Sequence, residues 1–243
     1  FFKPASFEPD PAHTPQWNRG AYLVQGLGHC AACHAPRNLL GATRDANALR
    51  GGVIPLQHWY APSLADTQEA GIRADDVAQT VQLLKTGIAA GRSAMGPMAE
   101  VVVRSTQHLT DDDLQAMAVY LTSLAAASPP APVSRAADRP APSATGEKIY
   151  TRHCAQCHGE QGEGAAGAYA PLAGNRAVTM GHSANLVQAV LSGGFPPATA
   201  DNPRPYGMPP FRQTLDDGEV AEVLTYIRQA WGNAAPAVSV LEV

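Results

Sequence analysis

A five-residue motif with two cysteines and a histidine occurs twice in this chain of 243 residues. The first copy is Cys-Ala-Ala-Cys-His at 30–34, and the second is Cys-Ala-Gln-Cys-His at 154–158. Together the copies contain all four cysteines of the chain, so none remains to form a disulfide framework. The repetition predicts two structural units, each organised around one copy.

Further features recur in the same order around both copies. A short helix is expected before each motif, and a Tyr-Ala-Pro triplet comes after each motif. Next come an amphipathic helix ended by glycine, an irregular segment with methionine, and a closing helix with an acidic first turn. The triplets begin at Tyr60 and Tyr169, the middle helices are predicted at 77–84 and 186–191, and the closing helices at 109–124 and 215–231. This shared order indicates tandem copies of one small helical domain.

Three chemistries use cysteines and histidine at this spacing. In c-type haem attachment, two thiols form thioethers with the porphyrin and the adjacent histidine ligates the iron. A zinc site needs four ligands, and each cluster supplies three at most. A redox dithiol typically follows a strand in a βαβ unit, and no such strand is expected here. The pattern therefore favours two covalently bound haem c groups, with Cys30, Cys33, Cys154 and Cys157 as thioether residues and His34 and His158 as iron ligands.

The second axial ligand of each iron is sought among the methionines, because a thioether raises the reduction potential and suits electron transfer. Met208 is the candidate of the second half, since the proline after it favours a rigid, non-helical loop. In the first half Met95 and Met98 compete. Met208 follows Pro171 by 37 positions. Met98 follows Pro62 by 36 positions, whereas Met95 follows Pro62 by 33 positions. The spacing therefore favours Met98.

The prolines and aromatic residues of the repeat are candidates for the surroundings of the haems. A ligating imidazole usually donates its second N–H to a carbonyl group that fixes its orientation. The backbone carbonyls of Pro62 and Pro171 are expected to accept these bonds, with ordinary turn residues as the alternative. Trp59, Tyr60 and Tyr169 are expected in the pocket walls, with plain core packing as the alternative.

The chain divides into five segments on this interpretation. The predicted fold class is all-α, with two tandem class I cytochrome c-like domains joined by an Ala/Pro-rich linker. This linker has no periodic apolar face, so it is expected to be semi-rigid or to wrap over one domain. The segments are an N-terminal extension or connector at 1–16, domains at 17–126 and 143–233, the linker at 127–142, and a tail at 234–243.

Composition and hydropathy exclude two classes of partner. Lys and Arg number 17 against 21 Asp and Glu, and this balance lacks the basic excess of nucleic-acid-binding proteins. No run approaches the roughly 18–20 apolar residues that cross a bilayer, so no transmembrane segment is expected in this chain. The opening residues lack the features of a signal peptide, so we expect a processed chain or a fragment of a longer one.

With these residues in view, the sequence resembles the multihaem cytochrome c subunits of membrane-bound bacterial dehydrogenases that act on alcohol, gluconate and sorbitol. The resemblance is densest in WNRGAYLVQGLGHCAACHAPRNLLGA, HWYAPSL, LLKTG, GPMAEVV, YAPLAGN and MPPF. It implies His34 with Met98 and His158 with Met208 as axial pairs. Members of the family typically carry three haem motifs and this chain has two, which indicates either a missing upstream domain or a two-haem relative that keeps the connector.

The resemblance implies electron transfer and no catalytic residues. Electrons would pass from the catalytic subunit of a periplasmic dehydrogenase through two His/Met haems towards quinone, a terminal oxidase or another respiratory acceptor. The expected location is periplasmic, with membrane association through a partner or a missing segment. A free-standing dihaem shuttle is one alternative. A dihaem peroxidase or oxidoreductase is the other, with one iron left open or ligated by a different residue such as His108 or His182.

Overall fold

The computed structural model describes residues 6–44, 48–126 and 143–243 of the chain. The predicted linker at 127–142 and the first five residues of the N-terminal extension lie outside the described residues. Contacts between residues divide the chain into two compact units. Unit 1 comprises Phe1–Val53, Ala61–Val81 and Leu109–Pro129, and unit 2 comprises Ile54–Tyr60, Gln82–His108 and Pro130–Val243.

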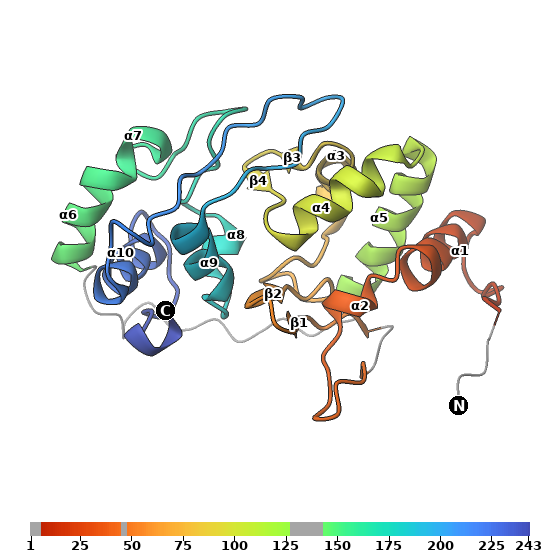
Figure 1. Cartoon of the computed structure of the whole chain (residues 1–243). Coiled ribbons are helices and arrows are strands. Elements are labelled where there is room, and N and C mark those ends of the chain that lie inside the picture. Colours follow the sequence, from red (N-terminus) through yellow and green to blue (C-terminus); the bar gives the residue numbers. More distant parts are fainter. Residues whose placement is uncertain (1–5, 45–47, 127–142) are drawn as a thin grey trace. The chain divides into compact units, whose positions relative to one another are not determined.

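Most regular structure in the described residues is helical, which confirms the predicted all-α class (Figure 1). The helices are α1 (Pro15–Tyr22), α2 (Ala31–His34), α3 (Val77–Thr86), α4 (Pro97–Arg104), α5 (Asp111–Ala126), α6 (Ala144–His153), α7 (Ala155–His158), α8 (Arg176–Thr179), α9 (Ala184–Ser192) and α10 (Asp217–Gln229). Two small two-stranded sheets, which the sequence did not predict, are formed by β1 (Gly52–Ile54) with β2 (Trp59–Ala61) and by β3 (Ile88–Ala89) with β4 (Arg92–Ser93). Strands of two or three residues are too short for a recognisable alternation of apolar and polar positions.

In unit 1 the helix before the motif packs closely against the closing helix, α1 against α5. Gly20 makes this approach possible, because a Cβ atom there would collide with the backbone carbonyl of Ala116 and with Cβ of Tyr120. The Trp17 ring meets the Tyr120 ring edge-on, with their centroids 5.0 Å apart. The indole N–H of Trp17 also donates to Ser123 Oγ at 2.8 Å. Aromatic packing and a glycine contact thus fix this crossing.

Unit 2 repeats this crossing between α6 and α10. Gly146 takes the place of Gly20, since a Cβ atom there would collide with the carbonyl of Glu222 and with Cβ of Tyr226. Tyr150 of α6 packs on Tyr226, with the ring centroids 5.5 Å apart. The alignment of Tyr120 with Tyr226 in the sequence therefore corresponds to equivalent packing positions in the two units.

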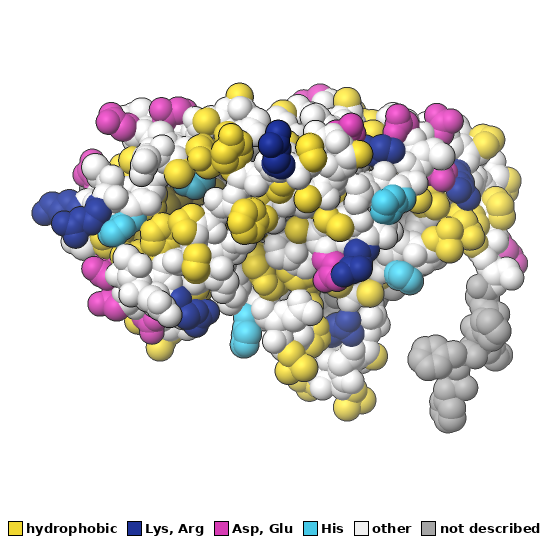
Figure 2. Space-filling model, turned by 45° about the horizontal axis from the view of Figure 1, so that its top comes forward, with side chains coloured by type: hydrophobic (Ala, Val, Ile, Leu, Met, Phe, Trp, Pro, Cys, Tyr) yellow, Lys and Arg dark blue, Asp and Glu magenta, His cyan; other side chains and the backbone are white. Residues whose placement is uncertain are grey.

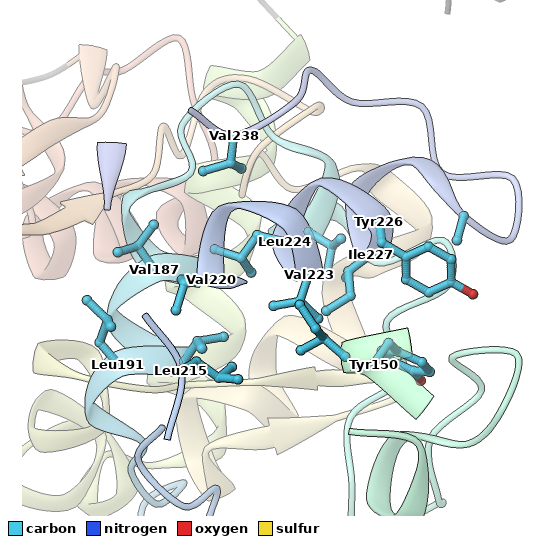
Figure 3. Packing of buried hydrophobic residues seen from close by; sticks show 14 residues of the cluster. Tyr150, Val187, Leu191, Leu215, Val220, Val223, Leu224, Tyr226, Ile227 and Val238 are labelled. Atoms are coloured by element: carbon cyan, nitrogen blue, oxygen red, sulfur yellow. The ribbon is translucent and has the colours of Figure 1, made fainter. Parts of the chain in front are cut away.

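The core of unit 2 lies between α6, α9 and α10 (Figure 3). Val220, Val223 and Leu224 of α10 are at most 1% exposed and form its centre. Cys154 and Met208 are partly buried against the same core. The hydrophobic interior therefore supports both the second motif and the methionine predicted to accompany it.

Side-chain caps define where α6 and α10 begin. Helix α6 precedes the second motif, and α10 is the closing helix of the second half. Ser143 Oγ accepts a hydrogen bond of 3.0 Å from the backbone N–H of Gly146 and so caps α6. Asp216 and Glu219 form a reciprocal capping box at the start of α10. Among the described residues, no helix has both the length and the apolar character needed to cross a membrane.

Candidate haem sites

The first motif lies on a short helix that follows α1. The chain leaves α1 through a π-helical turn at Leu23–Leu27 and enters α2 with Cys30 at the N-cap. The backbone N–H of His34 donates to the carbonyl of Cys30 at 2.8 Å, which closes one helical turn over the motif. Cys30 and Cys33, three positions apart in this turn, therefore lie on one side of the helix.

His34 is oriented by a backbone carbonyl from the Tyr-Ala-Pro triplet. Its Nδ1 lies 2.7 Å from the carbonyl oxygen of Pro62. Since a carbonyl oxygen only accepts, Nδ1 carries the proton and Nε2 keeps a free lone pair. Burial lowers the pKa of His34, against the opposing effect of the bond to Pro62, and this favours the neutral imidazole that ligates metals.

The second motif has the same local geometry. The N–H of His158 donates to the carbonyl of Cys154 at 3.0 Å, and α7 ends at His158 before Gly159, whose φ is +80°. His158 Nδ1 lies 2.9 Å from the carbonyl oxygen of Ala170. Burial lowers the pKa of His158 as it does for His34. Both motifs therefore present a neutral imidazole with Nε2 available.

The acceptor for His158 corrects one prediction, because it is the carbonyl of Ala170 and not that of Pro171. The Pro171 carbonyl instead accepts a hydrogen bond of 2.8 Å from Asn175 Nδ2. In the sequence, 28 positions separate His34 from its acceptor, whereas 12 separate His158 from its own. The shorter loop after the second motif reaches the histidine one residue earlier, so the second residue of the triplet is the acceptor there and the third is the acceptor in the first half.

The cysteines of both motifs are unpaired. Burial raises the pKa of the Cys30 thiol to about 11 and that of the Cys154 thiol to about 11. A catalytic dithiol depends on a lowered thiol pKa, so this environment is the reverse of what redox dithiol chemistry requires. In the described part of the chain, no three His, Cys, Asp or Glu side chains gather closely enough to hold a metal ion.

This donor set fits a c-type haem. Each motif has two thiols one helical turn apart, which can form thioethers, and an imidazole Nε2 that can ligate iron. Ser93 Oγ is the one buried side-chain polar atom that lacks a hydrogen-bond partner within the described residues. It lies in β4 of unit 2.

Met98 lies in a helix, which corrects the prediction of an irregular segment around it. Pro97 occupies the first turn of α4, where its fixed φ favours the helix, and Gly96 precedes it with a φ of +54°. Met98 therefore follows a sharp glycine turn and belongs to the first helical turn. Met95 lies just before that turn, and its Cε is turned towards Gly194.

Met208 lies in an extended, non-helical segment, as predicted from the prolines after it. Its N–H donates to the carbonyl of Gly194 at 2.8 Å, and the N–H of Gly194 donates to its carbonyl at 2.9 Å. Gly193 also lies close to the Met208 backbone, because a Cβ atom at Gly193 would collide with the Met208 carbonyl. From the sequence, these glycines were interpreted only as the end of a helix. One glycine suffices to end a helix, so the second glycine was the signal that could have indicated a close contact with another segment.

The three predicted aromatic residues have different surroundings. Tyr169 lies beside Cys157, which raises the pKa of the phenol, and its ring packs 5.4 Å from that of Tyr206. Trp59 lies against Gly96, at the turn that precedes Met98. Tyr60 is buried and stacks on His182, with the ring centroids 4.0 Å apart. Only Tyr169 is in contact with a motif residue in these interactions.

An open hollow of about 640 Å³ lies in unit 2 beside the two methionine segments. One side is α4, which contains Met98, and the other is formed by loop residues around Phe195 and Pro205. Phe195 is 67% exposed. Figure 2 shows one face of the molecule, on which hydrophobic side chains lie among both cationic and acidic ones. The residues that line the hollow include Ala99, directly after Met98, and Pro205, three positions before Met208.

Comparison with known proteins agrees with this donor set. The family model of cytochrome c matches residues 18–125 and again residues 143–231. The chain belongs to the cytochrome c family. This cytochrome c thus has two family segments, one around each Cys-x-x-Cys-His motif, and membership implies covalently bound haem c.

Curated relatives of this cytochrome c are named as dehydrogenase subunits. The cytochrome c subunit of the quinone-type alcohol dehydrogenase of Gluconacetobacter polyoxogenes is 36% identical over 96% of this chain and 53% of its own length. The cytochrome c subunit of gluconate 2-dehydrogenase from Pantoea cypripedii is 35% identical over 96% and 56%. The fructose dehydrogenase cytochrome subunit of Gluconobacter japonicus is 33% identical over 95% and 52%. The chain spans about half the length of these relatives.

Proposed function

We propose that this chain is a dihaem electron carrier with one His/Met-ligated haem c in each of two tandem domains, 17–126 and 143–233. The proposal rests on one observation made twice. In both motifs, the histidine Nδ1 is bonded to a backbone carbonyl, at 2.7 Å for His34 and 2.9 Å for His158. A histidine held through Nδ1 has a fixed ring orientation and directs Nε2 away from that carbonyl.

A bound haem c supplies a one-electron couple of iron. The residues of the chain anchor and tune it: Cys30 and Cys33 hold the first group, and Cys154 and Cys157 the second. His34 and His158 are the proximal ligands, and the carbonyls of Pro62 and Ala170 strengthen them as donors. Met98 and Met208 would supply the second ligand of each iron, which would leave no open position for substrate chemistry.

The relatives support a place for the carrier beside a dehydrogenase. Their names assign them to alcohol, gluconate and fructose dehydrogenases. By analogy, electrons enter this chain from a catalytic subunit in the periplasm and leave towards quinone or another respiratory acceptor. Association with the membrane would then come from a partner or from a segment outside this sequence.

Axial ligation is tested with single alanine variants of the methionines in the oxidised, matured protein. The sulfur-to-iron charge-transfer band is expected to fall by about half in Met98→Ala and in Met208→Ala, since each removes one of two thioether ligands. Met95→Ala is the matched control, because it lies three positions from Met98 and should leave the band unchanged. A band that survives both Met98→Ala and Met208→Ala contradicts the proposal.

The enzymatic alternative is tested on the wild-type protein. Two His/Met centres predict low-spin spectra and no peroxide turnover beyond that of free haem. A high-spin fraction with fast peroxide turnover would favour the peroxidase instead. Co-purification with a large dehydrogenase subunit from the native organism distinguishes a subunit from a free-standing shuttle, which would purify alone.

A further inference from the structure

The loop that orients the histidine of the second motif is bonded to a buried asparagine beyond the end of α10. Asn233 is 5% exposed. Its Oδ1 accepts a hydrogen bond of 2.8 Å from the N–H of Gly174, and its Nδ2 donates to the carbonyl of Leu172 at 3.0 Å. One side chain therefore fixes the backbone of the loop at two points. All of these residues belong to unit 2.

The same amide group also bonds to the helix from which it comes. Nδ2 of Asn233 donates a second hydrogen bond, of 2.8 Å, to the carbonyl of Ile227 in the last turn of α10. That carbonyl is among those that an α-helix leaves without an internal partner. Ile227 itself lies in the hydrophobic core of unit 2 (Figure 3). Asn233 thus uses both amide N–H groups and its oxygen to connect the loop to this core.

Only Pro171 separates this anchored stretch from the carbonyl that orients His158. The N–H of Leu172 donates to the carbonyl of Gly162 at 2.7 Å, so both backbone polar groups of Leu172 are bonded. Proline has a fixed φ, which limits how far the Ala170 carbonyl can turn on its own. That carbonyl sets the orientation and the donor strength of the His158 ring. Displacement of Leu172 should therefore reach His158.

The loop after the Pro62 carbonyl in the first half is held by different residues. The N–H of Ser63 donates to the carboxylate of Glu69 at 2.5 Å, and all three residues lie in unit 1. The hydrogen bonds of Asn233 lie within unit 2. Loss of the Asn233 side chain should therefore change the second site and leave the first as it is.

We propose that Asn233 is a positioning residue for the second haem. By fixing the loop at Leu172 and Gly174, it keeps the Ala170 carbonyl in place, and this carbonyl raises the electron donation of His158. The inference rests on the proposed function and deepens it. Stronger donation from the imidazole stabilises the oxidised iron, so Asn233 lowers the potential of the second haem relative to a site without this side chain.

The test measures the two midpoint potentials of the matured chain by spectroelectrochemical titration. The second haem is identified as the one whose potential falls in Met208→Ala, because loss of a thioether ligand lowers the potential. Asn233→Ala is expected to raise the potential of this haem and to leave the other unchanged. Asn233→Gln keeps the amide group on a longer side chain, so a smaller rise is expected. An unchanged or lowered potential of the second haem, or equal shifts of both haems, would overturn the inference.

A second measurement follows the proton that His158 Nδ1 donates to the Ala170 carbonyl. Its exchange with solvent is observed by nuclear magnetic resonance of the matured, oxidised protein. In Asn233→Ala this exchange should be about two- to tenfold faster, the factor that corresponds to the loss of one hydrogen bond. The Nδ1 proton of His34 is the internal reference and should exchange at its wild-type rate. Equal exchange rates for His158 in the variant and the wild type would also contradict the proposal.

Thr225→Ala is the matched control for a general loosening of the unit. Thr225 lies in α10, and its Oγ1 accepts a hydrogen bond of 2.9 Å from the N–H of Val238 and donates to the carbonyl of the same residue. These bonds hold the C-terminal tail and not the loop at 170–174, so Thr225→Ala should move neither potential. A rise in Thr225→Ala as large as that in Asn233→Ala would contradict a specific role for the asparagine.

The two remaining outcomes are also decisive. If Asn233→Ala does not accumulate as a matured protein, Asn233→Gln decides by the same two measurements. Failure of the proposed function is distinguishable, because the wild-type chain would then show fewer than two one-electron waves, or Met208→Ala would leave both potentials unchanged.

Discussion

Gly194 and Met208 exchange two backbone hydrogen bonds, of 2.9 Å and 2.8 Å. The pair holds the candidate sulfur ligand of the second haem on the end of α9, which is itself anchored in the core of unit 2. The neighbouring Gly193 allows this approach, because any side chain there would occupy the space of the Met208 carbonyl. A rigid backbone at the methionine keeps the thioether in place without help from the metal.

The first prediction concerns Gly193→Ala. The added Cβ should displace the Met208 carbonyl, so the contribution of Met208 to the sulfur-to-iron band should decrease in the oxidised protein. Gly232→Ala is the control, because Gly232 also has a positive φ, +82° against +61°, but has open space around it. Backbone strain is then similar in the two variants, and only the collision differs. Equal bands in the two variants would show that the close approach does not hold Met208.

The second prediction concerns the crossing of α6 and α10. Gly146→Ala places a Cβ on the carbonyl of Glu222, and overpacking of this kind costs about 1–3 kcal/mol. Denaturant unfolding followed by far-ultraviolet circular dichroism should show this loss in the free energy of unfolding. Gly181→Ala, at a site with nothing within 4 Å, should change stability by less than about 0.5 kcal/mol. Wild-type stability of Gly146→Ala would mean that the helices are not this close.

The third prediction is a pH dependence of the ion pair between α1 and α5. Arg19 Nε and Nη2 donate to the two carboxylate oxygens of Asp113 at 2.7 and 2.9 Å. This bonding holds the pKa of Asp113 below its ordinary value. A lowered pKa contributes stability that is present above the unfolded pKa of about 3.9 and is lost as the pH falls through the folded pKa.

Accordingly, Arg19→Ala should destabilise the protein by about 0.5–1 kcal/mol near pH 6, because the pair is partly exposed, and by almost nothing near pH 2. The measurement is the free energy of unfolding at both pH values. Arg73→Ala provides the comparison, since the side chains of Arg73 and Asp75 are 59% and 66% exposed. It should have a smaller effect at either pH. A difference between wild type and Arg19→Ala that persists at the lower pH contradicts this interpretation.

The sequence predicted the repeated parts of the molecule well. The helix periodicity and the acidic first turns follow local rules, so α3, α5, α9 and α10 were found within a few residues. Tyr120 and Tyr226 take equivalent positions in the closing helices, because each faces a glycine of the helix before its motif. Local patterns of this kind are preserved when a domain is duplicated.

The parts that differ between the repeats could not be predicted by alignment. The loop between motif and triplet is shorter in the second unit, so Ala170 replaces the expected Pro171 as acceptor for His158. A proline after glycine starts a helix at Met98, whereas prolines after Met208 keep the chain extended. The hydrogen bond between Asn185 and Tyr60 joins residues 125 positions apart in the sequence, and no local pattern encodes such a contact.

The fourth prediction addresses the central claim, that each motif binds one haem covalently. It is tested by the intact mass of the chain produced with cytochrome c maturation enzymes, in denaturing conditions that remove non-covalent groups. The wild-type mass should exceed the mass of the sequence by two haem groups. The double variants Cys30→Ala/Cys33→Ala and Cys154→Ala/Cys157→Ala should each retain one. A wild-type chain that carries one haem or none, or a variant that still carries two, would contradict the account.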